Sequence, residues 1–291
     1  MTVLEQLKER QSAPVRLIAL DMDGTVYNDQ KEITPRTKEA VKCAIASGIH
    51  VLPASGRPFV GIDPRFLAIE GVRFCIYSNG AGVRDIKTGE MIYSCCLKPD
   101  TLELLFDQIE CLDSTFELYR DGTVYASQRQ KENWYRLIPN AHIRAYVENT
   151  RIVTQESMKE FYHAHGGSVE KINCSYGDMR ERDKAWNRLQ HIPGILITSG
   201  LPENIEINAG KADKGEALLA LAEYLGISKE ETMACGDSSN DAAMIVKSGC
   251  GVAMGNAEET IKQLAKIQTQ TNEEEGVAYL LEAVMEFNTM F

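Results

Sequence analysis

The stretch VRLIALDMDGT, residues 15–25, determines how the rest of the chain can be interpreted. It begins with a nearly continuous run of apolar residues, namely Val15, Leu17, Ile18, Ala19 and Leu20. Such a run is typical of a strand that is buried on both faces of a parallel sheet. The run ends abruptly at Asp21 and Asp23, so the sequence predicts a core strand with carboxylates at its carboxyl end.

The residues that follow predict a strand–helix–strand unit. Thr34 reads as a helix N-cap and Pro35 as the first helical residue, which predicts a helix to about Ser47. The segment HVLPAS, residues 50–55, is a second short apolar strand. This order of elements is a βαβ unit. A third strand, within residues 73–82, ends in the polar turn Ser78-Asn79-Gly80.

The middle of the chain has a different pattern of apolar and polar residues. Residues 83–98 and 115–128 alternate and contain turn signals, which predicts antiparallel hairpins on either side of a helix at 99–112. Residues 154–206 combine two helical stretches with three short strands. From Lys211 the α/β rhythm returns, with helices expected near 213–225, 241–248, 257–267 and 277–287.

These elements predict an α/β fold with a doubly wound, mostly parallel, Rossmann-like sheet and an inserted α+β cap domain. We expect residues 1–83 to form the first part of the core, with a short N-terminal extension. Residues 84–206 form the inserted cap, and residues 207–291 complete the core. The sequence leaves open whether residues 1–13 dock on the core.

Composition limits the classes of partner. The 291 residues include 31 basic and 42 acidic side chains, so the net charge is −11. A surface of this sign repels nucleic acid and anionic lipid, and no local basic patch is evident. No apolar run approaches the ~20 residues that span a bilayer, and the N-terminus lacks the apolar stretch of a signal peptide. The eight cysteines show no metal-binding or disulfide spacing, so we expect reduced thiols and a cytoplasmic protein.

Polar residues recur where the parallel strands are expected to end. Asp21 and Asp23 follow the first strand, Ser55 ends the second, and Asp237 and Asp241 follow a late strand. Ligands of open α/β sheets bind outside the carboxyl ends of the strands. Four carboxylates gathered there would repel one another without a cation, and an oxygen-lined site that faces a phosphate is typical of Mg²⁺. The sequence therefore predicts a magnesium site.

This combination of residue types fits phosphoryl transfer. A carboxylate can attack phosphorus and form an aspartyl-phosphate once a cation cancels the repulsion between two anions. A second carboxyl group two residues further along the turn can protonate the leaving oxygen and later activate water. A lysine and a serine hydroxyl can hold the remaining phosphate oxygens.

At these motifs the chain resembles the haloacid dehalogenase-like hydrolases, in the Cof-type phosphatase branch with a large α+β cap. The resemblance covers the core from end to end and rests on LDMDGT (20–25), ASGRP (54–58), SNGA (78–81), ADKGEAL (212–218), GDSSND (236–241) and TNEEEGVA (271–278). The cap matches in size and alternation but offers no motif. Ser55 stands where threonine is frequent and Ser238 where asparagine is common, and both keep a small polar side chain.

The resemblance implies a role for each matched residue. Asp21 would be the nucleophile and Asp23 the acid/base. Ser55 would hydrogen-bond the phosphoryl group, and Lys214 would neutralise both that group and Asp21. The ion would be held by Asp21, the backbone carbonyl of Asp23, and Asp237, with Asp241 as a further ligand or as support.

Other residues near these motifs have two interpretations each. Asn240 steadies its loop or the phosphate, and Asn79 and Gly80 shape the entry to the cap or contact substrate. Arg57, after Gly56 in the phosphate-binding segment, reaches phosphate or pairs with a core carboxylate. Lys211 competes with Lys214 for the cationic role, and the Lys-Gly pair at a helix entrance favours Lys214.

The leading hypothesis is hydrolysis of a small soluble phosphomonoester, such as a sugar phosphate or a phosphorylated cofactor, with the cap closing over the site. Two alternatives stay open. A phosphomutase would return the phosphate to a sugar and need a bisphosphate activator, whereas a phosphate-ligand sensor would have no use for Asp23 beside Asp21. The sequence names neither the substrate nor the oligomeric state.

Overall fold

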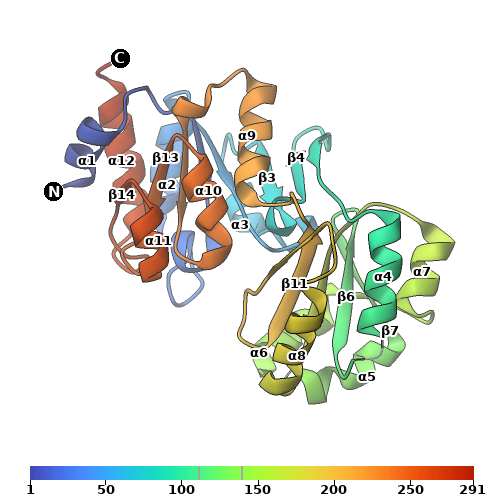
Figure 1. Ribbon diagram of the computed structural model, residues 1–291. Coiled ribbons are helices and arrows are strands. Elements are labelled where there is room, and N and C mark those ends of the chain that lie inside the picture. Colours follow the sequence, from blue (N-terminus) through green and yellow to red (C-terminus); the bar gives the residue numbers. More distant parts are fainter. Residues whose placement is uncertain (111, 139) are drawn as a thin grey trace. The chain divides into compact units, whose positions relative to one another are not determined.

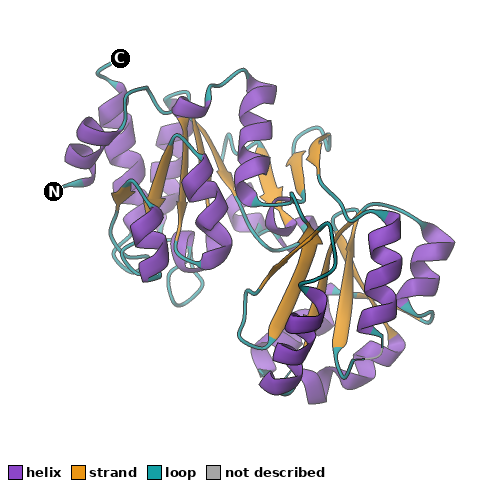
Figure 2. Ribbon diagram, viewed as in Figure 1, coloured by secondary structure: helices purple, strands orange, loops and turns teal. Residues whose placement is uncertain are grey.

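The computed structural model describes residues 1–110, 112–138 and 140–291. The chain forms two compact units, each with its own strands and helices (Figures 1 and 2). The first unit contains residues 1–55, 62–94 and 213–291, and the second contains residues 56–61 and 95–212.

A parallel sheet with the strand order β14-β13-β12-β1-β2 is the centre of the first unit. Every pairing in it is parallel, and β1 lies between β12 and β2. This placement puts the loop after β1 in the middle of the carboxyl edge of the sheet. The strands are β1 (Leu17–Leu20), β2 (His50–Pro53), β12 (Thr232–Gly236), β13 (Cys250–Ala253) and β14 (Ile267–Gln268).

A short antiparallel sheet follows β2. Ala54 forms an isolated parallel bridge with Ile76, which joins the end of β2 to β3 (Phe74–Tyr77). Strand β3 pairs antiparallel with β4 (Gly82–Asp85), and β4 pairs antiparallel with β5 (Met91–Ser94). The predicted hairpin at 83–98 therefore continues the first unit.

Helices cover both faces of the parallel sheet, because alternate strand residues point to opposite sides. On one face, Ile18 and Leu20 pack with apolar residues of α2 and α12. On the other face, Leu17 and Ala19 pack with α9 and α10. The expected doubly wound α/β core is confirmed. Its helices are α1 (Val3–Arg10), α2 (Pro35–Ala46), α3 (Pro64–Leu67), α9 (Lys214–Leu225), α10 (Ala242–Lys247), α11 (Glu259–Leu264) and α12 (Gly276–Asn288).

Helix α1 docks on the edge strand β14. The side-chain amide of Gln6 donates to the Gln268 carbonyl at 3.0 Å and accepts from the Gln268 N–H at 2.9 Å. Leu7 is completely buried in the core of the unit. An exposed sheet edge offers unpaired backbone groups to other chains, and the Gln6 amide occupies that position here as a neighbouring strand would.

The second unit is a six-stranded sheet with the order β10-β11-β9-β6-β7-β8. It is antiparallel except for the pairing of β7 with β8. The strands are β6 (Thr115–Arg120), β7 (Thr123–Ser127), β8 (Ile152–Thr154), β9 (Val169–Ser175), β10 (Ile195–Thr198) and β11 (Asn204–Ala209), and the helices are α4 (Pro99–Ile109), α5 (Gln128–Leu137), α6 (Ala141–Thr150), α7 (Met158–His165) and α8 (Met179–Leu189). This mixture is the α+β character expected for the inserted segment.

The two units differ in their limits from the domains that we expected at 83/84 and 206/207. Strands β4 and β5 extend the sheet edge of the first unit, so the second unit begins its long segment at Cys95. Strand β11 pairs with β9 and β10 inside the second sheet, so that unit continues to Ala212. The backbone pairing of the strands, rather than the hydrophobic pattern of the sequence, decides where each unit ends.

Two further observations bear on the compositional expectations. The cysteines that the structure describes are free thiols, and Cys111 lies outside the described residues. Among the described helices, none has both the length and the apolar content needed to cross a membrane.

Candidate active site

The loop after β1 brings the first two acidic residues to the carboxyl edge of the sheet. Asp21 is 5% exposed, and its backbone N–H donates to the Cys235 carbonyl at 2.9 Å, which continues the β1–β12 pairing. Gly24 follows in the left-handed region, with φ of 79°. A Cβ at Gly24 would lie 2.4 Å from a carboxylate oxygen of Asp237. Only glycine allows the loop to lie this close to the second acidic segment.

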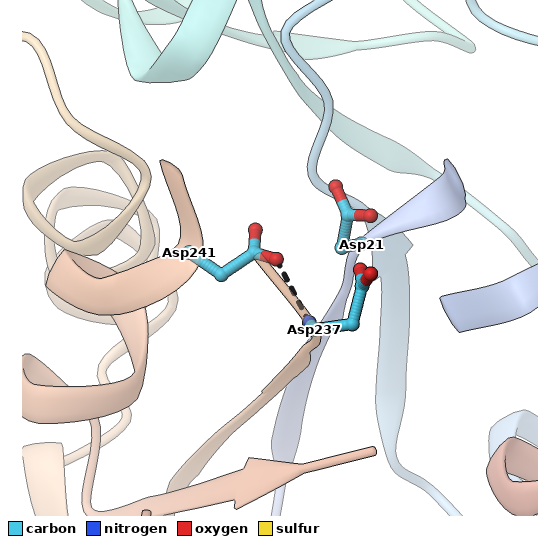
Figure 3. A group of neighbouring side chains, drawn as sticks. All are labelled: Asp21, Asp237 and Asp241. Carbon is cyan, nitrogen blue, oxygen red and sulfur yellow. Dashed lines mark hydrogen bonds between the residues drawn. The ribbon is translucent and has the colours of Figure 1, made fainter. Parts of the chain in front are cut away.

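Asp237 and Asp241 come from the loop after β12. The three side chains of Asp21, Asp237 and Asp241 each offer an oxygen, and these oxygens all lie within 4.8 Å of one another. Figure 3 shows the Asp237 carboxylate beside that of Asp21, with the Asp241 carboxylate to the left of both. One oxygen of Asp241 accepts from the backbone N–H groups of Asp237 and Ser238, at 3.0 and 3.1 Å. Asp241 therefore fixes the loop that presents Asp237.

Lys214 supplies the cation of the cluster. Asp213 caps α9 by accepting from two backbone N–H groups of its first turn, and Lys214 is the first residue of that helix. The Lys214 Nζ lies 2.5 Å from Oδ1 of Asp21 and 2.7 Å from Oδ1 of Asp241, and the side chain is completely buried. Lys211, the alternative candidate, is exposed and lies in the second unit.

The electrostatics of the cluster follow from burial and from like charges. Burial, reinforced by the neighbouring Asp241, raises the pKa of Asp21 well above its usual value, against the opposing effect of Lys214. Burial and Asp241 also raise the pKa of Asp237 to about 6. Burial alone would lower the pKa of Lys214, but Asp21 and Asp241 raise it above the usual lysine value. The lysine is thus held as a cation, and the carboxylates favour additional positive charge.

The loops after β2 and β3 bring Ser55 and Asn79 together. Ser55 is 3% exposed, its N–H donates to the Ile76 carbonyl at 3.0 Å, and its carbonyl accepts from the Asn79 N–H at 3.1 Å. Ser78, Asn79 and Gly80 are three consecutive residues with left-handed φ, of 50°, 58° and 89°. A Cβ at Gly80 would lie 2.2 Å from the backbone oxygen of Asp213, so the glycine allows this turn to pack against the start of α9.

The remaining expected site residues lie in different places. The side-chain oxygen of Asn240 accepts from the Ser238 hydroxyl at 2.8 Å, so it steadies the loop between Asp237 and Asp241. Gly56 and Arg57 belong to the second unit. The Gly56 carbonyl accepts from Lys171 Nζ at 2.6 Å.

Three further residues contact the predicted site residues and were not among the residues predicted from the sequence. The Thr25 hydroxyl donates to Asp237 at 3.2 Å, Lys31 Nζ contacts Asp23 at 2.9 Å, and Lys171 contacts Gly56. Thr25 was within a recognised motif and could have been found there. The two lysines carry no sequence signal, because turn geometry and strand register bring them into contact.

The donor set fits a small divalent cation. It consists of carboxylate oxygens, which hard cations prefer. Burial, with the neighbouring Asp241 carboxylate, raises the pKa of Asp21 and of Asp237, and a divalent ion would offset both the burial of these charges and their repulsion. The packing of Gly24 against Asp237 brings the backbone of the first loop next to the same carboxylates. The cluster could therefore hold a metal ion.

Comparison with known proteins establishes the family. The family model described as haloacid dehalogenase-like hydrolase matches residues 18–281. The chain belongs to this family, and the resemblance inferred from its motifs is confirmed. The match spans both the parallel-sheet core and the inserted α+β segment.

Named relatives agree with this assignment. The putative phosphatase YxeH of Bacillus subtilis is 31% identical, with 91% of this chain and 97% of the relative covered. The B. subtilis 5-amino-6-(5-phospho-D-ribitylamino)uracil phosphatase YcsE is 29% identical over 93% and 96% of the two chains. A solved haloacid dehalogenase-like hydrolase from B. subtilis is 28% identical, covers 92% and 99%, and superposes with a TM-score of 0.78. The expectation of a phosphatase is confirmed.

Proposed function

We propose that this phosphatase is magnesium-dependent and hydrolyses a small soluble phosphomonoester through an aspartyl-phosphate on Asp21. One observation carries the proposal. The Asp21 carboxylate is buried at the end of the central strand, contacts the Lys214 ammonium at 2.5 Å and shares an oxygen cluster with Asp237 and Asp241. One carboxylate would balance the charge of Lys214, whereas this buried site gathers three.

In the first step, a carboxylate oxygen of Asp21 attacks phosphorus as the ester P–O bond breaks. Asp23 gives its proton to the departing oxygen, and the product alcohol leaves. In the second step, Asp23 takes a proton from water as the water oxygen attacks phosphorus. The acyl-phosphate bond breaks, inorganic phosphate leaves, and the Asp21 carboxylate and protonated Asp23 are restored.

Two residues stabilise the transferring group. Lys214 is preorganised by its two carboxylate contacts and by the capped start of α9, so its charge faces the phosphoryl group without rearrangement. Ser55 is fixed by backbone hydrogen bonds to Ile76 in β3 and to Asn79 in the turn after it, and can donate its hydroxyl to a phosphoryl oxygen. Gly56, Arg57, Asn79 and Asn240 are proposed to complete the binding of the substrate.

Magnesium would be held by the carboxylates of Asp21 and Asp237 and by the backbone carbonyl of Asp23. When bound, the ion lowers the repulsion between the carboxylate nucleophile and the phosphate dianion. Asp241 supports this arrangement, because one of its oxygens accepts from Lys214 and the other from two backbone N–H groups. Its role is to orient Asp237 and Lys214.

The substrate class follows from the site and from a relative. YcsE is named for a phosphate ester of a ribityl side chain, which is a primary alkyl phosphate on a small metabolite. We propose a substrate of this size and charge, either a sugar phosphate or a phosphorylated cofactor precursor. A panel of such esters, including 5-amino-6-(5-phospho-D-ribitylamino)uracil, ranked by kcat/KM would identify the preferred leaving group.

The test of the function is release of phosphate from 4-nitrophenyl phosphate in the presence of Mg²⁺. We expect turnover that chelation abolishes and added Mg²⁺ restores, and loss of turnover in Asp21→Asn. The matched control is Glu70→Gln, because Glu70 is an exposed carboxylate of the first unit that takes no part in the site cluster. Turnover in Asp21→Asn equal to that of the control would remove Asp21 as the nucleophile.

A further inference from the structure

The turn formed by residues 28–32 has an unusual backbone. Lys31 adopts a left-handed conformation, with φ of 59°. Its N–H donates to the Asn28 carbonyl at 2.9 Å, and the Asn28 side chain accepts from the Glu32 N–H at 2.8 Å. A non-glycine residue with positive φ is strained, and it persists only where its surroundings determine it.

Hydrogen bonds that start at a buried residue of the core hold this turn in place. Arg65 Nη2 donates to the Lys31 carbonyl at 2.9 Å and to Asp63 at 2.7 Å. The Asp63 side chain is 8% exposed, caps α3 and accepts from the buried Tyr27 hydroxyl at 2.8 Å. The strained residue is therefore anchored through Arg65 and Asp63 to a buried tyrosine.

The anchored turn directs the Lys31 side chain to Asp23. Its Nζ lies 2.9 Å from Oδ1 of Asp23. The Asp23 side chain is 44% exposed, in contrast to the buried Asp21 two residues earlier. Packing restricts an exposed carboxylate little, so a charged neighbour on a fixed turn has a large share in setting its direction.

We propose that Lys31 is a positioning residue for the acid/base step and orients the Asp23 carboxylate towards the leaving group. The inference rests on the proposed function and deepens it. Proton transfer needs the carboxyl oxygen within about 2.6–3.2 Å of the atom that it protonates. Lys31 acts through Asp23 and makes no contact with substrate in this scheme.

The plainer interpretation is an exposed ion pair with no consequence. Pairs of this exposure contribute little to folding and are common on protein surfaces. The backbone of Lys31 favours the positioning role over an ion pair without function. An ion pair without function would need neither a left-handed residue nor the hydrogen bond from Arg65 that holds it. Strain of this kind concentrates at functional sites.

The test compares two substrates of nearly equal shape. The leaving group of 4-nitrophenyl phosphate departs readily without a proton, whereas that of phenyl phosphate depends more on protonation by Asp23. Lys31→Met removes the cation and keeps an unbranched side chain that is one atom shorter. We expect kcat/KM, which reports the step that expels the leaving group, to fall more for phenyl phosphate, so that the ratio of the two kcat/KM values changes about two- to fivefold, the range set by an exposed ion pair.

Two further variants complete the experiment. Lys31→Arg retains the charge and should restore the wild-type ratio. Lys42→Met is the matched control. Lys42, on α2, forms an exposed ion pair with Glu70 at 3.5 Å, and its replacement should leave the ratio unchanged.

The outcomes separate the inference from the function on which it rests. An equal loss for both substrates in Lys31→Met, no loss, or failure of Lys31→Arg to restore the ratio would each overturn the role of Lys31 and leave the phosphatase intact. Absence of wild-type turnover with both esters would overturn the proposed function, and the inference about Lys31 would fall with it.

Discussion

Replacing Lys214 by methionine removes the buried positive charge that contacts both Asp21 and Asp241. The substitution keeps an unbranched apolar stem and ends one atom short of the ammonium position. It leaves Asp21 and Asp241 buried and facing one another without the ammonium that lay 2.5 and 2.7 Å from them. We expect both a loss of activity and a large loss of stability in the metal-free protein.

The magnitude follows from the burial of the lysine. Removing one partner of a buried ion pair costs about 3–5 kcal/mol, because the other charge remains buried without compensation. A free-energy change of this size corresponds to about two to four powers of ten in an equilibrium constant. Protonation of Asp21, whose pKa is already raised, relieves part of the repulsion. The cost should therefore be smaller at low pH and smaller again with saturating Mg²⁺.

The assay must report on the first unit. Both tryptophans, Trp134 and Trp186, lie in the second unit, so their fluorescence reports on the unfolding of that unit. Hydrogen exchange of the amides in β1 and β12 follows the first unit directly. For Lys214→Met in metal-free buffer, we expect protection there to fall by about two to four powers of ten.

The matched control is Lys247→Met. Lys247 contacts Asp213 and Glu216 at 2.7 Å, like Lys214 in having two carboxylate partners, but its side chain is 33% exposed. An exposed pair contributes about 0–1 kcal/mol, so protection should change less than tenfold. Equal effects of the two substitutions would refute the reasoning that burial of the Lys214 charge controls the stability of the site.

Three other predictions concern the ion, the sheet edge and a turn. Burial raises the pKa of Asp237 to about 6, so the folded metal-free chain binds the Asp237 proton more tightly than the unfolded chain does. The protonated carboxyl group therefore stabilises the fold at a pH below the usual aspartate pKa. This contribution is lost as the pH rises through about 6. Mg²⁺ affinity, measured by calorimetry, should rise over the same interval, and a constant affinity from pH 5 to 7 would contradict this. Gln6→Ala removes two hydrogen bonds to β14 and should cost about 1 kcal/mol in urea unfolding and increase light scattering; unchanged values would show that the edge needs no cover. Gly80→Ala should lower both kcat and stability by more than Gly89→Ala. Both glycines have positive φ, but of the two only Gly80 would bring its Cβ against backbone, 2.2 Å from the Asp213 oxygen before α9. Equal effects of the two substitutions would mean that positive φ alone matters.

The core could be predicted from the sequence because its signals are local. A buried parallel strand such as residues 17–20 is a short apolar run, and the acidic turn after it marks the carboxyl edge of the sheet. Parallel topology then requires loops from β1 and β12 to meet, since these strands are neighbours. The meeting of Asp21 with Asp237 thus follows from strand order, although the two residues are far apart in the chain.

The inserted unit was harder to predict. Helices α5 and α6 lie within residues 128–150, where the sequence analysis assigned no element, because the first six residues of α5 are all polar. Their buried stripe is short: Trp134 and Ile138 pack with Val147 and Ala126. Long-range packing of a few residues decides these helices, and it leaves little periodicity in the sequence.

Contacts at the site that depend on long-range packing were likewise not predictable from the sequence. The carboxylates, Ser55 and Lys214 belong to motifs, whereas Lys31 reaches Asp23 only because an anchored turn takes a left-handed conformation. Lys171 meets Gly56 through its place in strand β9. Contacts of this kind depend on turn geometry and strand register, which single residues do not reveal.

The most direct measurement of the central claim is acid quenching during turnover of 4-nitrophenyl phosphate, followed by mass spectrometry of peptides. We expect one phosphoryl group on the peptide that contains Asp21, appearing within the first turnover and persisting longer in Asp23→Asn, which lacks the base for hydrolysis. Phosphate release with no label on that peptide, or with the label on another residue, would contradict the account.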